Sequence, residues 1–145
     1  MPKRLTIAMY PAEDILSSVG EKTEMEIKVD GKVYLVKLGS LRLRTFKEND
    51  TCVCCGRVGT VMGLDLPIGS PRPHFNLYHK DKKGKRTLMT KDHIIPKSRG
   101  GKNHISNMQT MCCDCNLKKA DKTPEEYAEY FKKRKMLNNT IVYVE

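Results

Sequence analysis

Two neighbouring side chains, Asp92 and His93, have the chemical types that metal-assisted hydrolysis requires. An imidazole titrates near neutral pH and is the commonest general base, and a carboxylate is a ligand for hard divalent ions. Asn107 and Asn116 follow fourteen and twenty-three residues after His93 and add amide oxygens of the kind that Mg²⁺ accepts. Together these types favour hydrolysis of a phosphodiester bond, in which a base activates water and a metal ion stabilises charge on the phosphate.

Each of these four residues also has a structural interpretation. His93 could donate a hydrogen bond to the backbone, and Asp92 could orient His93 instead of binding a metal ion. Asn107 could cap a turn, and Asn116 could be an amide at the start of a helix. Neighbouring side chains of an extended strand point to opposite faces, so we expect the strand that carries Asp92 and His93 to end or bend there.

Six cysteines form two clusters, TCVCCG at 51–56 and MCCDCN at 111–116. Each cluster contains one C-x2-C pair, and two such pairs can place four thiolates around one Zn²⁺ ion. Disulfides are the alternative, but this spacing in an intracellular chain favours metal. Cys54 and Cys113 are then spare thiols. We therefore predict a closed, structural zinc site that staples a folded module and is made of Cys52, Cys55, Cys112 and Cys115.

The positive charge of the chain is uneven. The formal net charge is +10; residues 1–50 carry nine basic against eight acidic residues, which gives +1, and residues 51–145 carry eighteen against nine, which gives +9. This asymmetry indicates a polyanionic partner for the second part, and nucleic acid is the first candidate. The cations expected to contact its backbone lie close to the asparagines and the histidine: Lys97, Arg99, Lys102, Lys118, Lys119 and Lys122.

Length and hydropathy limit the class of protein. At 145 residues the chain is most simply one domain with a small appendage. It contains no run of about 18 apolar residues that would span a membrane, and its N-terminus lacks the apolar stretch of a secretory signal. We expect a soluble intracellular, cytoplasmic protein with no membrane partner.

The first fifty residues predict a short helix at 11–19, a β-hairpin at 24–38 and a helix that begins after Ser40 and ends near 49–50. The hairpin is the clearest of the three, because Asp30-Gly31 is a type I′ turn signal. That turn places apolar residues opposite apolar residues and opposite charges across from each other, so the register is self-consistent.

The remainder predicts short elements around the candidate site. The glycines and prolines of residues 56–73 indicate an irregular loop. Two strands, HFNLY and RTLMTKDH, flank the polar turn KDKKGK, and residues 107–111 form a short strand or lead into a helix at 112–120. Thr123-Pro124-Glu125-Glu126 is a capping box that opens a C-terminal helix with its aromatics on one core-facing side. The last segment, IVYV at 141–144, has the pattern of an edge strand.

The stretch CVCCG…TKDHIIPKSRGGKNHISNMQTMCCDCNLKKAD resembles the HNH endonucleases, whose core is the ββα-metal fold. The resemblance covers about residues 40–123. It consists of Asp-His-Ile-x-Pro, a Gly-Gly loop, Asn-x-Gln before Met-Cys-x-x-Cys-Asn, and a lysine three residues later. It implies an α+β protein with a ββα-metal core stapled by zinc, an N-terminal β-hairpin extension and a C-terminal helix.

The resemblance also implies a role for each candidate residue. His93 would be the general base, and Asp92 would bind a catalytic Mg²⁺ or Mn²⁺. Asn107 would support the base and the loop, and Asn116 would be the second ligand of that ion. Asn116 stands where the family name has its last histidine, as in the HNN variants, and an amide oxygen suits Mg²⁺ and Mn²⁺. The four cysteines of the two pairs match the zinc-binding subset of the family.

The expected organisation has three parts: an accessory segment at 1–49, an HNH nuclease core with zinc knuckles at 50–123, and a C-terminal helix and strand at 124–145. The expected function is metal-dependent endonucleolytic cleavage of DNA, most simply double-stranded. The alternatives are a zinc-stapled nucleic-acid-binding module without catalysis, and a docking subunit of a DNA-processing complex. The sequence leaves open whether the chain forms a homodimer and whether one or two strands are cut.

Overall fold

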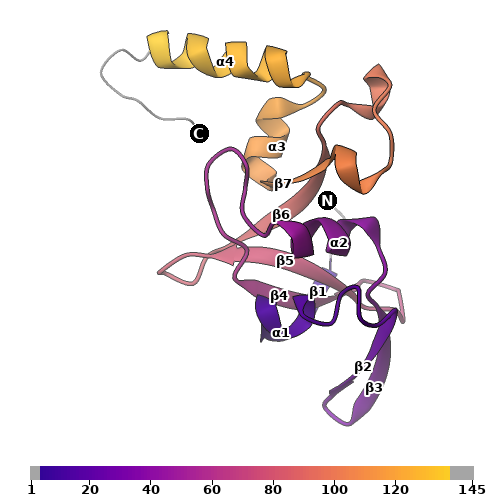
Figure 1. Ribbon diagram of the computed structural model, residues 1–145. Helices are drawn as coiled ribbons and strands as arrows, with labels where there is room; N and C mark the ends of the chain where they lie inside the picture. Colours follow the sequence, from indigo (N-terminus) through magenta and orange to yellow (C-terminus); the bar gives the residue numbers. More distant parts are fainter. Residues whose placement is uncertain (1–3, 138–145) are drawn as a thin grey trace.

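The computed structural model describes residues 4–137, with side chains to residue 130. Its main element is a five-stranded antiparallel sheet with strand order β1-β4-β5-β6-β7, and a separate hairpin is formed by β2 and β3 (Figure 1). The strands are β1 (Arg4–Pro11), β2 (Glu24–Val29), β3 (Lys32–Lys37), β4 (Val61–Pro67), β5 (His74–Lys80), β6 (Arg86–His93) and β7 (Met108–Cys112). The helices are α1 (Ala12–Leu16), α2 (Leu41–Glu48), α3 (Cys113–Lys119) and α4 (Pro124–Leu137), with 3-10 turns at Lys97–Arg99 and Ile105–Asn107.

The fold is therefore α+β, as the sequence predicts, and the N-terminal hairpin is confirmed in detail. Glu24 lies opposite Lys37, and Ile27 lies opposite Tyr34. Asp30 and Gly31 both have positive φ, 49° and 81°, which is the backbone of a type I′ turn. Local turn chemistry and alternating hydrophobicity were sufficient to predict this register.

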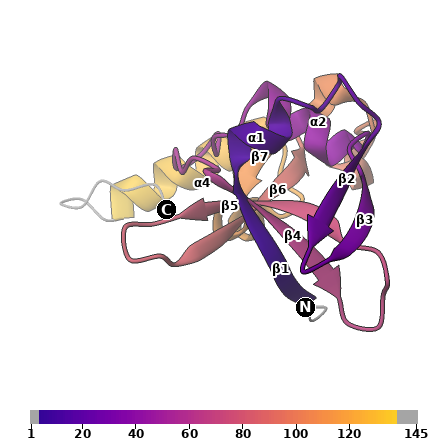
Figure 2. The same ribbon diagram turned by 90° about the horizontal axis from the view of Figure 1, so that it is seen from below.

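The main core lies between the sheet and the two N-terminal helices, which sit side by side on one face of the sheet (Figure 2). Ser40 caps α2, since its side chain accepts a hydrogen bond from the Leu43 amide at 3.1 Å, as predicted. Phe46 of α2 and Phe75 of β5 are both almost fully buried there. The first helix is shorter than predicted at both ends: Pro11 is still the last residue of β1, and the helix ends at Leu16 instead of near residue 19.

The expectation of an irregular loop at 56–73 was wrong for its central part, which forms β4 between β1 and β5. Gly63 and Asp65 disfavour a strand when only the local sequence is considered. Gly63 is needed because a Cβ there would lie 2.9 Å from the Tyr78 ring. Asp65 is buried but accepts hydrogen bonds from Thr6, Tyr78 and Asn76. The conformation of β4 therefore depends on residues that are distant in the sequence. Strand β1 pairs with β4, and the sequence analysis did not predict it because its partner also lies far along the chain.

Strand β6 has two partners along its length, and this arrangement builds the candidate site. Its first residues pair with β5 from Tyr78 to Lys80, and its last residues, Met89–His93, pair with β7. Helix α3 follows β7 directly and packs across both strands. The result is a β6-β7-α3 unit at one end of the molecule, with α4 above it (Figure 1).

The C-terminal helix begins as the capping box predicts. The Glu126 amide donates to the Thr123 hydroxyl at 3.3 Å, and the Thr123 amide donates to the Glu126 carboxylate at 2.9 Å. Tyr127 packs against the core and stacks with Tyr130. The edge strand predicted at 141–144 lies outside the described residues. None of the helices within residues 4–137 is long and apolar enough to cross a membrane.

Candidate active site and zinc site

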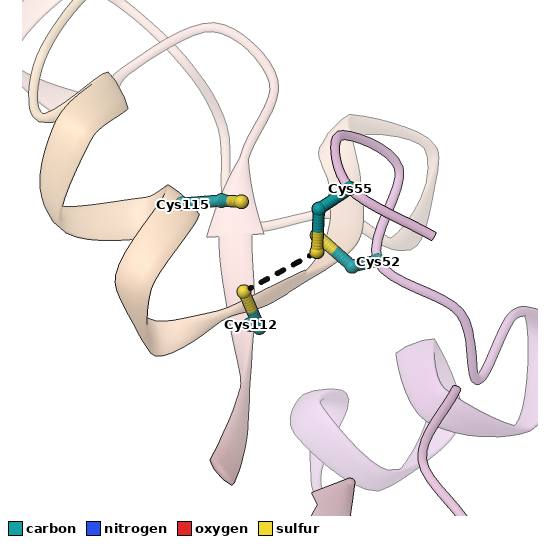
Figure 3. Close-up of side chains that lie close together, drawn as sticks. All are labelled: Cys52, Cys55, Cys112 and Cys115. Atoms are coloured by element: carbon teal, nitrogen blue, oxygen red, sulfur yellow. Dashed lines mark hydrogen bonds between the residues drawn. The ribbon is translucent and has the colours of Figure 1, made fainter. Parts of the chain in front are cut away.

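The four cysteines of the two C-x2-C pairs converge on one point (Figure 3). Cys52 and Cys55 come from the loop after α2, and Cys112 and Cys115 come from the β7–α3 junction. Their sulfur atoms all lie within 4.8 Å of one another, and the Cys55 and Cys112 sulfurs are 3.7 Å apart. Tetrahedral Zn–S bonds of about 2.3 Å give a sulfur–sulfur separation of about 3.8 Å, so the cluster fits zinc.

Arg57 supports this cluster from outside. Its guanidinium donates to the Cys112 sulfur at 3.2 Å and forms a 3.2 Å ion pair with Asp114. Burial alone would raise the pKa of the Cys112 thiol, but hydrogen bonds from the Cys115 backbone and from Arg57 bring that pKa below its ordinary value. Burial raises the pKa of the Cys55 thiol. A thiolate at Cys112 is the form that binds zinc.

The two remaining cysteines are outside the cluster. Cys54 is half-buried, and its sulfur lies 3.1 Å from the hydroxyl of Tyr127, so it links the zinc loop to α4. Cys113 is half-buried at the first residue of α3, beside Asp114. Neither Cys54 nor Cys113 belongs to the group of four cysteines that could bind zinc.

Asp92 does not point toward the His93 ring but into the space between β6, β7 and α3. Its carboxylate forms a 3.2 Å ion pair with the Lys119 ammonium and accepts a 3.0 Å hydrogen bond from the Gln109 amide. Asp92 is 8% exposed and Lys119 1%, so the pair is buried. A carboxylate this well buried requires a cation, and in this structure Lys119 supplies it.

Lys119 was expected to contact nucleic acid, and its burial contradicts that expectation. Its ammonium group also donates to the carbonyl oxygen of His93 at 3.0 Å. One lysine from α3 therefore holds both residues of the Asp-His pair, one through its carboxylate and the other through its backbone. The sequence shows a lysine at helical spacing but does not show which way the helix turns it.

His93 is half-buried at the end of β6. Its Nε2 atom lies 2.6 Å from the amide oxygen of Asn103. A carbonyl oxygen can only accept, so this contact places the ring proton on Nε2 and leaves a lone pair on Nδ1. Asn103 was not among the residues singled out in the sequence, because a lone exposed asparagine in a basic loop carries no distinctive signal.

Asn107 closes the loop that carries Asn103. Its amide oxygen accepts from the Ile95 amide at 3.0 Å, and its NH₂ group donates to the carbonyls of Ile95 and Lys102 at 3.1 and 3.0 Å. Gly101 allows this closure, since a Cβ there would lie 1.7 Å from the Ile95 carbonyl oxygen. The side chain of Asn107 therefore holds the backbone on both sides of the loop.

Asn116 lies on the face of α3 that covers β6. Its NH₂ group donates to the Thr90 hydroxyl at 2.8 Å, and Lys119, three residues later on the same face, bonds Asp92. Thr90 and Asp92 are two residues apart and share one side of β6. Asn116 and Asp92 are thus on facing surfaces, and their oxygens are the hard donors that Mg²⁺ and Mn²⁺ prefer.

The other predicted nucleic-acid contacts differ in how they are engaged. Lys97 and Lys102 are exposed. Arg99 forms an ion pair with Glu126. Lys122 donates to the Lys118 carbonyl at 3.0 Å and lies over the Tyr130 ring. Arg99 and Lys122, which were expected to contact nucleic acid, therefore interact with other groups of the protein.

The fold and geometry define a small ββα unit with a histidine, a carboxylate and an asparagine between a strand end and a crossing helix. Residues 79–132 match the family model described as HNH endonuclease, which supports a relationship of this segment to that family. The match spans β6, β7 and α3 but not Cys52 and Cys55. The match supports a nuclease-type function. Comparisons with curated proteins and with solved structures gave no match.

Proposed function

We propose that this protein is a metal-dependent HNH endonuclease that hydrolyses phosphodiester bonds of double-stranded DNA. The observation that carries the proposal is the coupling of the Asp-His pair to α3. Lys119 bonds the Asp92 carboxylate and the His93 carbonyl, and Asn116 bonds Thr90 on the same strand. The family match over residues 79–132 supports a nuclease. We also propose that the nuclease core spans residues 50–123, between an accessory N-terminal segment and a C-terminal helix.

His93 acts as the general base. The contact with Asn103 holds the ring through Nε2, so Nδ1 takes the proton from an attacking water. The water oxygen forms a bond to phosphorus, the bond from phosphorus to the leaving sugar oxygen breaks, and that oxygen takes a proton from solvent. Asn107 is a positioning residue in this scheme, since it fixes the loop on which Asn103 lies.

Asp92 and Asn116 would hold the catalytic divalent ion, Mg²⁺ or Mn²⁺. When bound, such an ion stabilises negative charge on the phosphate and the leaving oxygen. Lys119 balances the Asp92 carboxylate and keeps it directed toward α3. Gln109 holds the same carboxylate oxygen at 3.0 Å, so the orientation of Asp92 has two independent supports.

The four-cysteine cluster would hold a structural zinc ion without a catalytic role. Four thiolates complete the tetrahedral coordination of zinc and leave no position for water. Cys112 and Cys115 flank the start of α3, and Asn116 follows immediately. Zinc binding would therefore fix the end of the helix that presents Asn116 to β6.

A supercoiled-plasmid assay at low salt tests the proposal. Zinc-loaded protein is incubated with plasmid and Mg²⁺, with plasmid and Mn²⁺, and with no added divalent ion. We expect nicked or linear product only with the divalent ions, and the product distinguishes cleavage of one strand from cleavage of two. Binding of DNA without cleavage under any of these conditions would support the non-catalytic binding module instead.

A further inference from the structure

The turn between β5 and β6 is the most strongly charged segment in the described chain that the candidate site does not use. Residues 80–86, called here the basic hairpin tip, read KDKKGKR and carry five basic residues against one acid. All seven residues are exposed. Their net charge of five minus one, +4, is a large share of the +10 of the whole chain.

The single acid of the tip is used to build the turn. The Asp81 carboxylate accepts hydrogen bonds from the Lys83 and Lys85 amides at 2.8 and 2.9 Å. The Asp81 amide donates to the Lys85 carbonyl at 2.9 Å, and Gly84 takes the left-handed conformation with φ 87°. The turn is therefore ordered by its own backbone, and its lysine side chains project from a defined frame.

The cations of the tip lack acidic partners. Within the described residues, no ion pair joins a carboxylate to any of the five. Arg86 is held in place by the Thr6 hydroxyl at 3.0 Å and by the ring of Tyr78, 4.7 Å from its guanidinium carbon. In contrast, Arg99 and Lys119 near His93 are paired with acids. The tip thus gathers, within seven consecutive residues, five cations without an acidic partner in the described part of the chain.

Strand β6 fixes the distance between the tip and the site. The strand runs from Arg86 to His93, eight residues, and the tip projects from the end opposite to the loop after His93 (Figure 1). At about 3.4 Å per residue the separation is about 24 Å. Neighbouring phosphates along one DNA strand are about 3.4 Å apart along the axis, so this distance corresponds to about seven base pairs.

We infer that the basic hairpin tip is a second contact to the DNA backbone, which binds phosphates about seven base pairs from the scissile bond. The inference rests on the proposed function, because it takes DNA as the substrate. Lysine ammonium groups on a preformed turn contact phosphates without reading bases, so this contact adds affinity and orientation but no sequence preference. The partner that fits is duplex DNA, since a stiff duplex can reach both ends of β6 at a fixed spacing.

The test compares two triple variants that remove the same charge. Lys82→Gln/Lys83→Gln/Lys85→Gln removes three of the five positive charges of the tip, and Lys22→Gln/Lys28→Gln/Lys37→Gln removes three from exposed lysines of the N-terminal part. Both are made in a His93→Ala background, so that a fluorescent 30-base-pair duplex of mixed sequence stays intact. Its affinity is measured by anisotropy between 50 and 200 mM KCl. Thermal unfolding checks that each variant is folded.

We expect the tip variant to bind at least about tenfold more weakly and to lower the slope of log affinity against log salt by about 2 to 3, since each phosphate contact contributes about 0.9. The control variant changes affinity less than about threefold. A tip variant that matches the control overturns the inference, as does an equal loss on a single-stranded 30-mer that binds as tightly as the duplex.

Cleavage separates this inference from the proposed function. With His93 restored and plasmid at limiting concentration, the tip variant should cut more slowly than the parent in proportion to its lost affinity, whereas the control variant should cut at the parental rate. Cleavage by the parent together with unchanged binding by the tip variant would refute only the second contact. A parent that cuts no plasmid would refute the proposed function itself.

Discussion

The buried pair of Asp92 and Lys119 gives the sharpest energetic prediction. Its two charged atoms are 3.2 Å apart, and their side chains are 9% and 2% exposed. With an effective dielectric constant of about 20, the attraction is about 5 kcal/mol. Breaking such a pair from one side costs about 3 to 5 kcal/mol, because the other charge is left buried and uncompensated. Lys119→Met keeps most of the length of the side chain but removes its charge and its hydrogen bond to the His93 carbonyl.

We expect Lys119→Met to lower the free energy of unfolding by about 3 to 5 kcal/mol and the melting temperature by about 10 °C or more. The neutral double variant Asp92→Asn/Lys119→Met should recover most of this loss, since neither charge is then buried alone. The assay is urea denaturation of zinc-loaded protein, followed by circular dichroism without added magnesium or manganese. Lys102→Met, which replaces an exposed lysine of the loop after His93, is the control and should change stability by less than about 0.5 kcal/mol.

Added Mn²⁺ extends the same experiment to the metal. In Lys119→Met the Asp92 carboxylate lacks its ammonium partner, so Mn²⁺ should raise the melting temperature of this variant more than that of the parent. Equal stability of Lys119→Met and the parent would refute the reasoning about the buried pair. A double variant that is as unstable as the single variant would refute it as well.

Three further predictions concern the elements that hold the site. Cys112→Ser should lose zinc and unfold the module, because zinc binding supplies folding free energy; Cys113→Ser should retain zinc, and metal analysis with circular dichroism distinguishes them. Gly101→Ala should reduce cleavage by about a hundredfold, since its Cβ would strike the Ile95 carbonyl and displace the loop after His93. Gly39→Ala, at a position with ordinary φ and open space, is the control for the cleavage assay. Asp65→Asn should cost about 3 to 5 kcal/mol, because it leaves Arg4 without its buried carboxylate.

The Asp65 prediction includes a pH dependence. Burial raises the pKa of Asp65, but hydrogen bonds from Thr6, Tyr78 and Asn76 and the charge of Arg4 bring it below the ordinary value of 3.8. Its stabilising contribution is therefore complete above about pH 3.8 and is lost as the pH falls through the lower folded value. Urea denaturation across acid pH should show this loss in the parent and not in Asp65→Asn. If the free energy of unfolding fell equally with decreasing pH in both proteins, the role given to Asp65 would be contradicted.

Features set by local chemistry could be predicted from the sequence. The Asp30-Gly31 turn fixes the first hairpin, Ser40 caps α2, and Thr123 with Glu126 caps α4. The cysteine pairs belong to the same group, because C-x2-C spacing reflects the geometry of a single metal ion. In each case a few neighbouring residues determine the conformation.

Features set by tertiary packing could not be predicted. Strand β4 depends on Thr6, Asn76 and Tyr78 to satisfy Asp65, and no local pattern contains those partners. Lys119 carries the same positive charge as its exposed neighbours, and only the docking of α3 on β6 turns it inward. The contact between Asn103 and His93 depends in the same way on closure of the loop by Asn107.

The central claim is that His93 is the base of a phosphodiester hydrolysis, and one measurement tests it most directly. The rate of plasmid cleavage with Mg²⁺ is compared between the parent, His93→Ala and His74→Ala, which removes an exposed histidine at the start of β5. We predict that His93→Ala lowers the rate by about two to four powers of ten while DNA affinity is kept, as expected for a general base, and that His74→Ala cuts like the parent. Cleavage by His93→Ala at the parental rate would contradict the account.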